Sequence, residues 1–429
     1  MGLHKKTIKD VSLSGKTVLV SVDYNVPAGE HGEVLDDYRI RMSMPTLQYL
    51  LDQDCKVVLI SHRGRPDGKV EPNLSLKKVA ESLEKLVKRE VLFVDDCVGP
   101  KAENAKKTLR NKQILMLENT RFYAQEEAND KSFAQQLASG VDYFVQDAFG
   151  NAHRSHASTD AITNFVPSVA GLLIENEYKA VTDVILNPDR PLTAIVGGAK
   201  IADKIDVLKT FIKTADLLAI GGAMASTFLD AKGVEVGKSL VDEDEIDTAK
   251  HILDLAEAES KKRPFVFYLP QDVVVADKID KHAKTRIVDF DAHVIADIES
   301  YPRQPRSNTR KIRPDELILD IGPFSGAFIA GSIQYAKTVI WNGLMGVTET
   351  PSINGPVGPF AHGTELILDA LCGQFGNRPY SLIGGGDTSA YIEERGLVKC
   401  SNHVSTGGGA TLDLLAGKKL PGIEALQDK

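Results

Sequence analysis

The chain has 429 residues, more than one hydrophobic core usually serves at about 100–200 residues per domain, so we expect two domains. Its 42% hydrophobic and 26% charged residues are typical of a globular protein. The formal net charge of -8 excludes non-specific nucleic-acid binding through overall positive charge, and no apolar run approaches the roughly 20 residues of a membrane span.

Four cysteines, Cys55, Cys97, Cys372 and Cys400, lie far apart and form no C-x-x-C pair. Their spacing indicates neither a zinc site nor a redox-active dithiol, and it fits a reducing compartment. The first residues, MGLHKKTIKD, lack an apolar signal segment. We therefore expect a soluble cytoplasmic protein.

The first half of the chain alternates strand-like and helix-like segments. Apolar runs of strand length lie near residues 17–22, 56–60, 91–94, 114–117 and 142–146. Between the second and third runs, LSLKKVAESLEKLVKRE carries apolar residues at helical spacing. This βαβ alternation predicts a parallel sheet with right-handed crossovers and helices on both faces.

Four runs of the first half end in polar or cationic residues, namely VLVSVDYN, VVLISHRGR, ILMLENTR and YFVQDAFGNAHR. A single loop arginine is usually a solvated surface charge. However, the carboxyl ends of parallel strands share one edge, where several cations repel one another unless they bind an anion. The pattern predicts a site for a phosphorylated metabolite with a carboxylate. Its candidate residues are Asp23, Asn25, Arg39, His62, Arg63, Arg65, Arg121, His153, Arg154 and His156.

A long helical pattern, AGLLIENEYKAVTDVILNPDRP, follows and stops at Asn187-Pro188. It predicts a helix between the two domains. Two interpretations remain open: the helix is a hinge, or it is one more crossover helix.

A second βαβ series runs from about 192 to 406, and four of its strand-like runs end on glycines. These runs are LTAIVGGAK, LLAIGGAM, YSLIGGGDTS and HVSTGGGA. Glycine has no Cβ, so main-chain amides at such strand ends can approach phosphate oxygens. The second domain is therefore expected to bind a nucleotide.

Charged residues follow two of these glycine runs. Lys200 and Lys204 are four residues apart, and we expect both to project from one face of the following helix. They either bind nucleotide phosphates or are neutralised by the nearby Asp203 and Asp206. In GGGDTS, the residues after the glycines are either ordinary helix caps or a site for Mg²⁺ on a phosphate.

Common nucleotide motifs are missing from the sequence. GVEVGKS at 233–239 has three residues between its glycines where a P-loop needs four, and it follows a helix-like segment. The dinucleotide pattern G-x-G-x-x-G and the protein-kinase H-R-D loop are also absent. The nucleotide site is thus of another kind.

The chain resembles phosphoglycerate kinases from end to end. The resemblance rests on segments in the family's order and at about its spacing: VDYNVP, SHRGRP, LENTRFYAQEEAND, DAFGNAHRSHAS, GGAKIADKI, GGAMASTFL, GKSL, DIGP, WNGLMGV, GGGDTSA and STGGGATLDLLAGKKLPGIEAL. It implies reversible, Mg²⁺-dependent transfer of a phosphoryl group between 1,3-bisphosphoglycerate and ADP, which gives 3-phosphoglycerate and ATP. Transfer would be direct and in line, within a closed cleft between the domains.

The resemblance also implies an α/β fold with two doubly wound, Rossmann-like parallel-sheet domains. Residues 1–171 would bind 3-phosphoglycerate, 172–189 would form the interdomain helix, and 190–406 would bind the Mg-nucleotide. The tail from about 407 to 429 would pack back on the first domain. A monomer without nucleic-acid or membrane partners is expected.

Site residues follow from the same resemblance. The triose acid would be bound by Asp23, Asn25, Arg39, His62, Arg65, Arg121 and Arg154. The nucleotide would be bound by Gly197, Gly198, Lys200, Lys204, Gly221, Gly222, Asn342, Glu349, Gly384, Gly385, Gly386, Asp387 and Thr388. Asp387 would be the metal ligand and Glu349 would bind the ribose. Transfer itself would depend on Arg39, Lys200, Gly385 and Gly386.

The chemistry is consistent with this set of residues. A substrate carboxylate, with a pKa near ~4, is ionised at neutral pH and needs no general base. Catalysis can then rest on positioning and on charge neutralisation. The sequence departs from the family's common pattern at Ser21, Arg63, Gln146 and Leu344, and in the long segment TPSINGPVGPFAHGT after Glu349. At Arg63 the common residue is a leucine or another apolar residue.

The sequence argues against two rival functions. A nucleotide-dependent oxidoreductase on a doubly wound fold is disfavoured by the missing G-x-G-x-x-G pattern. A catalytically silent binding or moonlighting protein with the same fold is disfavoured by the intact set of Arg39, Lys200, Lys204 and Asp387.

Overall fold

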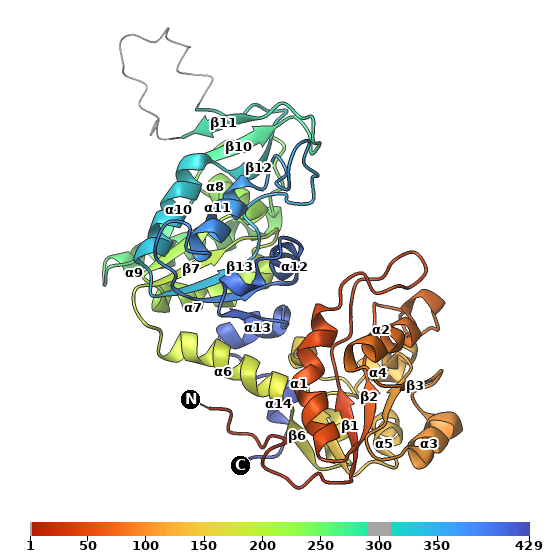
Figure 1. The fold of residues 1–429 in the computed structure, drawn as a ribbon. Helices are drawn as coiled ribbons and strands as arrows, with labels where there is room; N and C mark the ends of the chain where they lie inside the picture. The colour runs from red at the N-terminus through yellow and green to blue at the C-terminus, as the bar shows by residue number, and fades with distance from the viewer. Residues whose placement is uncertain (1, 291–309) are drawn as a thin grey trace, which may run out of the picture. The chain divides into compact units, whose positions relative to one another are not determined.

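The computed structural model describes residues 2–290 and 310–429. The chain forms two compact units, Met1–Thr182 with Lys418–Lys429 and Asp183–Gly417 (Figure 1). Each unit contains its own six-stranded sheet, and all strand pairs of both sheets are parallel. The expected α/β fold with two doubly wound parallel sheets is confirmed.

The sheet of the first unit has the strand order β3-β4-β2-β1-β5-β6. Its strands are nearly continuous apolar runs, because helices cover both faces of the sheet and leave no polar side. The bounds are β1 (Thr17–Ser21), β2 (Lys56–Ile60), β3 (Val91–Val94), β4 (Ile114–Leu117), β5 (Tyr143–Gln146) and β6 (Ser168–Ala170).

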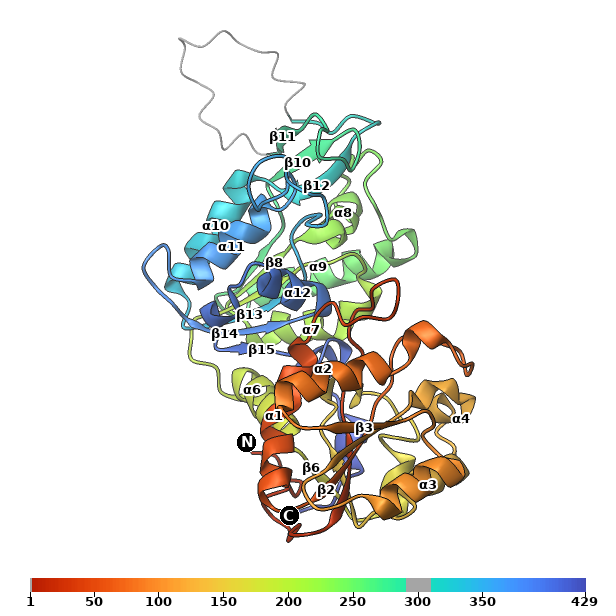
Figure 2. The same ribbon diagram turned by 45° about the vertical axis from the view of Figure 1, so that its right-hand side comes forward.

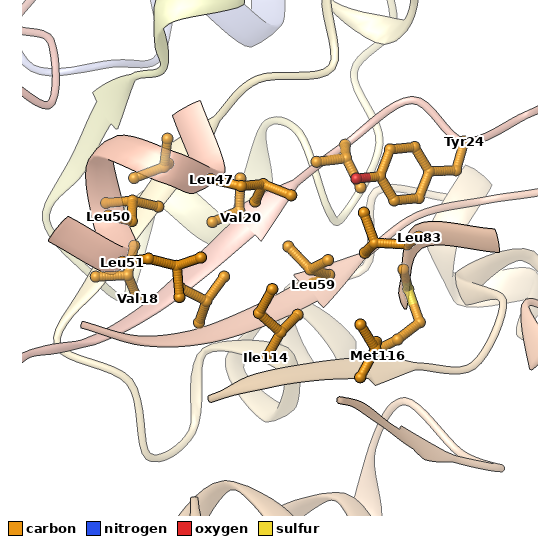
Figure 3. Close-up of a cluster of buried hydrophobic side chains, with 14 of the residues drawn as sticks. Val18, Val20, Tyr24, Leu47, Leu50, Leu51, Leu59, Leu83, Ile114 and Met116 are labelled. Carbon is orange, nitrogen blue, oxygen red and sulfur yellow. The ribbon is translucent and has the colours of Figure 1, made fainter. Parts of the chain in front are cut away.

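Alternate residues of these strands enter two different cores. Val18 and Val20 of β1 pack with α1 and α2, whereas Leu19 packs on the opposite side with α3 and α5. Figure 3 shows the first of these cores, with leucines of α1 and α2 against the strands. The helices of this unit are α1 (Tyr38–Asp52), α2 (Lys77–Val87), α3 (Gly99–Thr108), α4 (Ala124–Glu127) and α5 (Lys131–Ala138).

The last residues of the chain are bonded to the first unit. The Lys5 ammonium donates to the carbonyls of Glu424 (2.7 Å) and Leu426 (3.0 Å), and Gly422 N donates to Ala152 O (2.9 Å). This segment contains α14 (Pro421–Glu424), whereas α13 (Gly409–Leu415) packs against α7 of the second unit. The return to the first unit therefore begins at Lys418 rather than near residue 407.

The sheet of the second unit has the order β15-β14-β13-β7-β8-β9, and Figure 2 shows β13, β14 and β15 side by side. Its strands are β7 (Leu192–Val196), β8 (Leu217–Ile220), β9 (Val266–Tyr268), β13 (Thr338–Asn342), β14 (Tyr380–Gly384) and β15 (His403–Val404). Its other helices are α7 (Ile205–Thr214), α8 (Gly222–Ala231), α9 (Ile246–Ser260), α10 (Pro323–Tyr335), α11 (His362–Leu371) and α12 (Gly386–Glu394).

A three-stranded antiparallel sheet in the second unit was not predicted. It has the order β11-β10-β12, with β10 (Asp272–Ala276), β11 (Arg286–Asp289) and β12 (Leu317–Ile321). Its apolar residues form two small clusters of their own. Strands β10 and β12 contribute to the wall of a cavity in the second unit.

Helix α6 (Leu172–Leu186) matches the long helical pattern, and the division between the units falls within it. Its amino-terminal amides are held by side chains of the first unit: Leu172 N donates to Thr46 Oγ1 and Leu173 N to Asp147 Oδ1, both at 3.0 Å. Among the residues that the structure describes, no helix has the length and apolar character needed to cross a membrane.

Two of the four cysteines are paired. Cys372, just after α11, forms a disulfide with Cys400, whereas Cys55 and Cys97 are free and buried. The structure thus corrects the interpretation of all four cysteines as those of a reducing compartment. The pairing is not visible in the sequence, because the folding of β14 and α12 brings together residues 28 positions apart.

Candidate functional site

The candidate anion-binding residues of the first unit lie at the carboxyl edge of its sheet. Asp23 and Asn25 follow β1, His62 and Arg65 follow β2, Arg121 follows β4 and Arg154 follows β5, while Arg39 is on the first turn of α1. Parallel strands deliver their carboxyl ends to one edge, so the sequence positions converge in space. The contacts below show how closely they approach.

Asp23 and Arg39 form a buried ion pair, in which Arg39 Nη1 donates to Asp23 Oδ2. Burial by itself would raise the pKa of Asp23, but the charge and hydrogen bond of Arg39 outweigh it and hold that pKa below its usual range. Asp23 is therefore an anion that orients Arg39. The guanidinium remains partly exposed, with 29% of its side chain accessible, so it can contact a ligand.

His62 is neutral at physiological pH. Burial is the largest cause that lowers its pKa, to about 3, and the nearby Arg121 and Arg154 lower it further, while Asp23 opposes them. Its Nδ1 lies 3.1 Å from the amide nitrogen of Asn151, which can only donate. The ring proton is therefore on Nε2, where it can donate to an oxygen of a ligand.

Arg121 is nearly buried, with 3% exposure, and its Nη1 donates to Gly64 O at 2.8 Å. Its Nε lies 3.2 Å from a Glu127 oxygen but lacks hydrogen-bond alignment. Burial lowers the pKa of Arg121, Glu127 raises it, and Arg154 and Arg65 lower it. Arg154 and Arg65 are thus each close enough to repel Arg121, and a bound anion would relieve that repulsion.

Two asparagines hold these loops together. Asn25 Oδ1 accepts from Gly64 N at 2.9 Å, which joins the ends of β1 and β2. Asn119 Oδ1 accepts from Arg63 N (3.2 Å) and Arg121 N (3.0 Å), which joins the ends of β2 and β4. Sequence reasoning missed Asn119, although it stands between the strand-like run and Arg121 in LENTR.

The second unit contains a cavity of about 650 Å³ at the carboxyl ends of β7, β13 and β14. The expected residues that line it are Gly198, Lys200, Lys204, Gly222, Asn342, Glu349, Gly385, Gly386, Asp387 and Thr388. The remaining expected residues, Gly197, Gly221 and Gly384, do not line it. A Cβ at Gly197 would lie 2.1 Å from Leu344 O, and one at Gly221 would lie 2.3 Å from the Met345 sulfur. These glycines instead permit close packing behind the cavity wall.

The two lysines differ from their expected placement. Lys200 lies in the loop before the helix, and Lys204 lies in a single 3₁₀ turn (Ala202–Lys204) that precedes α7. The chain leaves β7 through Gly198 at φ 100°, a conformation that delays the helix. The expectation of one shared helical face is wrong, yet both lysines reach the cavity. Burial lowers the pKa of Lys204, while Asp203 and Asp387 raise it.

The start of α12 is built for an anion. Gly385 precedes the helix at φ 97°, and no side chain caps the free amides of the first turn. The Thr388 hydroxyl accepts from Gly343 N at 2.9 Å, which joins the start of α12 to the residue after β13. Asp387 is exposed in the first turn and places a carboxylate at the cavity.

The cavity is also lined by apolar side chains, which sequence reasoning missed. These side chains come from the antiparallel sheet, from the segment after β13 and from a loop residue: Leu240, Val273, Ile318, Leu319, Met345 and Val347. Gly408 and Gly409 add a glycine edge, which HVSTGGGA indicated. A cavity lined by cations, free amides and apolar side chains suits a nucleotide, whose phosphates and base have these different requirements.

Comparisons with known proteins agree with this geometry. A family model described as phosphoglycerate kinase matches residues 8–418. The chain is 43% identical over 427 residues to a phosphoglycerate kinase of Moorella thermoacetica and 44% identical over 434 residues to one of Koribacter versatilis, with 100% of each chain covered.

Solved structures are similar as well. The chain matches the structure of phosphoglycerate kinase from Coxiella burnetii with a TM-score of 0.78 and 33% identity, and that from Pyrococcus horikoshii with 0.80 and 28%. In both cases 98% of each chain is covered.

Proposed function

The chain belongs to the phosphoglycerate kinase family, and we propose how its own residues divide the work of that enzyme. It is a kinase that transfers a phosphoryl group reversibly between a carboxyl group and a nucleotide: 1,3-bisphosphoglycerate and ADP give 3-phosphoglycerate and ATP. The residue assignments that follow are our proposals.

We propose that the first unit binds 3-phosphoglycerate. Arg65, Arg121 and Arg154 provide the charge for a phosphate or carboxylate, and the Nε2 proton of His62 donates to an oxygen of the same ligand. The support for this assignment is the repulsion of Arg121 by Arg65 and Arg154 at one sheet edge. Arg39, oriented by Asp23, serves the oxygens nearest the reacting carboxylate.

We propose that the second unit binds ATP or ADP. The observation that carries this assignment is the mixed lining of its cavity, which combines Lys200, Lys204 and the start of α12 with apolar side chains. The phosphates would lie against the lysines and the start of α12, and the base against Leu319, Met345 and Val347. Glu349 lines the same cavity and would accept hydrogen bonds from the ribose hydroxyls.

Mg²⁺ is the expected cofactor, and the residues present fit it. Mg²⁺ prefers oxygen ligands and commonly uses one or two carboxylates together with substrate phosphates. Asp387 offers such a carboxylate at the proposed phosphate-binding part of the cavity. When bound, the ion would neutralise negative charge on the nucleotide phosphates.

The protein's part in the transfer is positioning and charge stabilisation. The acceptor carboxylate is already ionised, so no side chain needs to remove a proton. Arg39, Lys200 and the amides of Gly385 and Gly386 would donate to the oxygens of the moving phosphoryl group, whose charge spreads in the transition state. Because the two ligands are assigned to different units, we propose α6 as the hinge that lets them meet.

The direct test is a coupled assay with 3-phosphoglycerate, ATP and Mg²⁺, combined with calorimetric titration of each ligand. We expect turnover, and independent binding of the two ligands. Binding of both ligands without turnover would instead favour the catalytically silent homologue. Failure to bind 3-phosphoglycerate would contradict the assignment of the first unit.

A cytoplasmic location and a monomeric state are part of the same proposal. The location suits an enzyme of glycolysis, but the Cys372–Cys400 disulfide opposes it, because disulfides are rare in reducing compartments. Alkylation of free thiols in protein extracted under acid quenching would decide between reduced and paired cysteines. Sedimentation would determine the oligomeric state.

A further inference from the structure

Arg63 is an almost completely buried arginine in the first unit. It follows β2 in the loop that carries His62 and Arg65, and only 1% of it is exposed. Because a buried guanidinium is costly unless its donors are satisfied, a chain that keeps one is expected to use those donors. Arg63 also stands at a position where the phosphoglycerate kinases that this chain resembles commonly have an apolar residue.

All hydrogen bonds of the Arg63 side chain go to main-chain carbonyl oxygens. Nη1 donates to two of them, Nη2 to two and Nε to one. The acceptors are Gly32 O (2.8 Å), Ser75 O (3.3 Å), Glu33 O (3.2 Å), Pro27 O (3.5 Å) and Val26 O (3.4 Å).

Four of these five acceptors belong to one segment, residues 26–33, which we call the β1–α1 loop. This loop connects the strand end that bears Asp23 and Asn25 to the helix that bears Arg39. The guanidinium contacts both arms of the loop, at 26–27 and at 32–33. The Arg63 guanidinium therefore fixes the separation of the two arms of the loop.

The main chain of Arg63 joins the same network to the other loops. Asn119 accepts from Arg63 N and donates to Arg63 O at 2.7 Å, and the next residue, Gly64, donates to Asn25 and accepts from Arg121. Arg63 and the adjacent Gly64 thus connect the loops that follow three strands, β1, β2 and β4. These loops carry the proposed anion-binding side chains.

We propose that Arg63 is a positioning residue of the 3-phosphoglycerate site, one that acts by holding the β1–α1 loop so that Asn25 and Arg39 keep their places. Arg63 itself contacts no ligand, since its donors are used by the loop. The inference rests on the proposed binding of 3-phosphoglycerate to the first unit.

The geometry of the guanidinium explains why another residue would not serve. The guanidinium carries five N–H donors in a planar fork. In this structure the donors reach carbonyls on both arms of the loop. Lysine offers three donors from one nitrogen and would satisfy only part of the set. Leucine would leave the carbonyls without these donors and loosen the loop.

The test compares Arg63→Leu, Arg63→Lys and Arg63→Ala with a matched control, Arg89→Leu, which changes an exposed arginine of the same unit. We expect Arg63→Leu to raise the Kd and KM for 3-phosphoglycerate about tenfold or more, with a smaller rise for Arg63→Lys. The Kd for ATP should stay within about twofold of the wild type. Guanidinium ion at millimolar concentration should partly restore 3-phosphoglycerate binding to Arg63→Ala, whereas sodium chloride should not.

Amide hydrogen exchange provides a readout that does not depend on the ligand. Gly29 and Leu35 donate hydrogen bonds inside the loop, and their protection should fall in the Arg63 variants while that of β1 and β2 is kept. Unchanged 3-phosphoglycerate affinity in Arg63→Leu would overturn the inference, as would an equal loss of protection throughout the unit. If the wild type itself fails to bind 3-phosphoglycerate, the proposed function fails, and loop protection still decides the role of Arg63.

Discussion

Asp23 and Arg39 are bonded to each other across the connection between β1 and α1, so the proposed catalytic cation is oriented before any ligand binds. An arginine held by a carboxylate loses little conformational freedom when it meets the substrate. This relationship makes Arg39 the first residue to test.

Replacement of Arg39 or Lys200 by alanine should reduce kcat about 100-fold or more, because each side chain is proposed to stabilise charge that develops in the transition state. ATP affinity should change far less. Steady-state kinetics and calorimetry separate the two effects, and Arg41→Ala, two residues along α1, is the control. A variant with near-normal kcat and a raised KM would show that its side chain only binds substrate.

Arg65→Ala and Arg154→Ala should each weaken 3-phosphoglycerate binding about tenfold, since one charge-assisted contact is lost from the anion site. The Kd for Mg-ATP should not change, because the nucleotide cavity lies in the other unit. Arg110→Ala removes an exposed charge of the first unit and serves as the control. An equal loss for both ligands would indicate a shared site or misfolding.

Asp387→Asn should weaken Mg-ATP binding about tenfold but leave metal-free ATP binding nearly unchanged, because an amide is a poor Mg²⁺ ligand while the lysines remain. Titration can be followed by fluorescence, since Trp341 is the only tryptophan and directly precedes Asn342 at the cavity. Asp203→Asn is the matched control, as Asp203 lines the same cavity near Lys204. Equal losses with and without metal would argue against a ligand role.

His62 should make the first unit less stable as pH falls below neutrality, whereas Glu126 and Asp147, whose pKa values burial raises to about 7, act in the opposite direction. Burial lowers the pKa of His62 to about 3, whereas the unfolded chain protonates histidine near ~6.5. The contribution of neutral His62 to the free energy of unfolding is therefore fully present above pH ~6.5. It is lost as pH falls toward ~3, by about 1.4 kcal/mol per pH unit.

Urea unfolding followed by far-UV circular dichroism at several pH values would measure this slope. His62→Gln should reduce the slope of the free energy of unfolding against pH by the amount that corresponds to about one proton. The control His31→Gln, at an exposed histidine, should not change the slope. The fluorescence of Trp341 reports the second unit separately. An unchanged slope in His62→Gln would mean that His62 is not the group that titrates.

Reduction of the Cys372–Cys400 disulfide should destabilise the second unit by about 3.6 kcal/mol, the loop-closure value for cysteines 28 residues apart. Urea unfolding monitored by Trp341 with and without reductant measures the change, and Cys372→Ser should mimic reduction. The first unit, whose Cys55 and Cys97 are unpaired, should not respond. Four free thiols in the purified, unreduced protein would contradict the pairing.

Much of the architecture is determined locally and could be predicted. The runs at Thr17–Ser21 and Leu192–Val196 are mostly apolar because both faces of their sheets are covered, and this pattern can be recognised without any tertiary information. Glycines after β7 and β14 mark the proposed phosphate-binding part of the cavity for a similar reason, because only a residue without Cβ fits those turns. The long pattern that became α6 carries its own helical period.

Other features depend on which segments meet in space. Strands β10 and β12 are short and pair with each other although they are distant in sequence, so their apolar residues gave no sign that they would line this cavity. Lys200 left the expected helix because Gly198 turns the chain before it. The pairing of Cys372 with Cys400 and the burial of Arg63 under the β1–α1 loop are likewise non-local. A sequence shows which donors and thiols exist, but the free energy of burying or pairing them depends on neighbours that only the folded chain supplies.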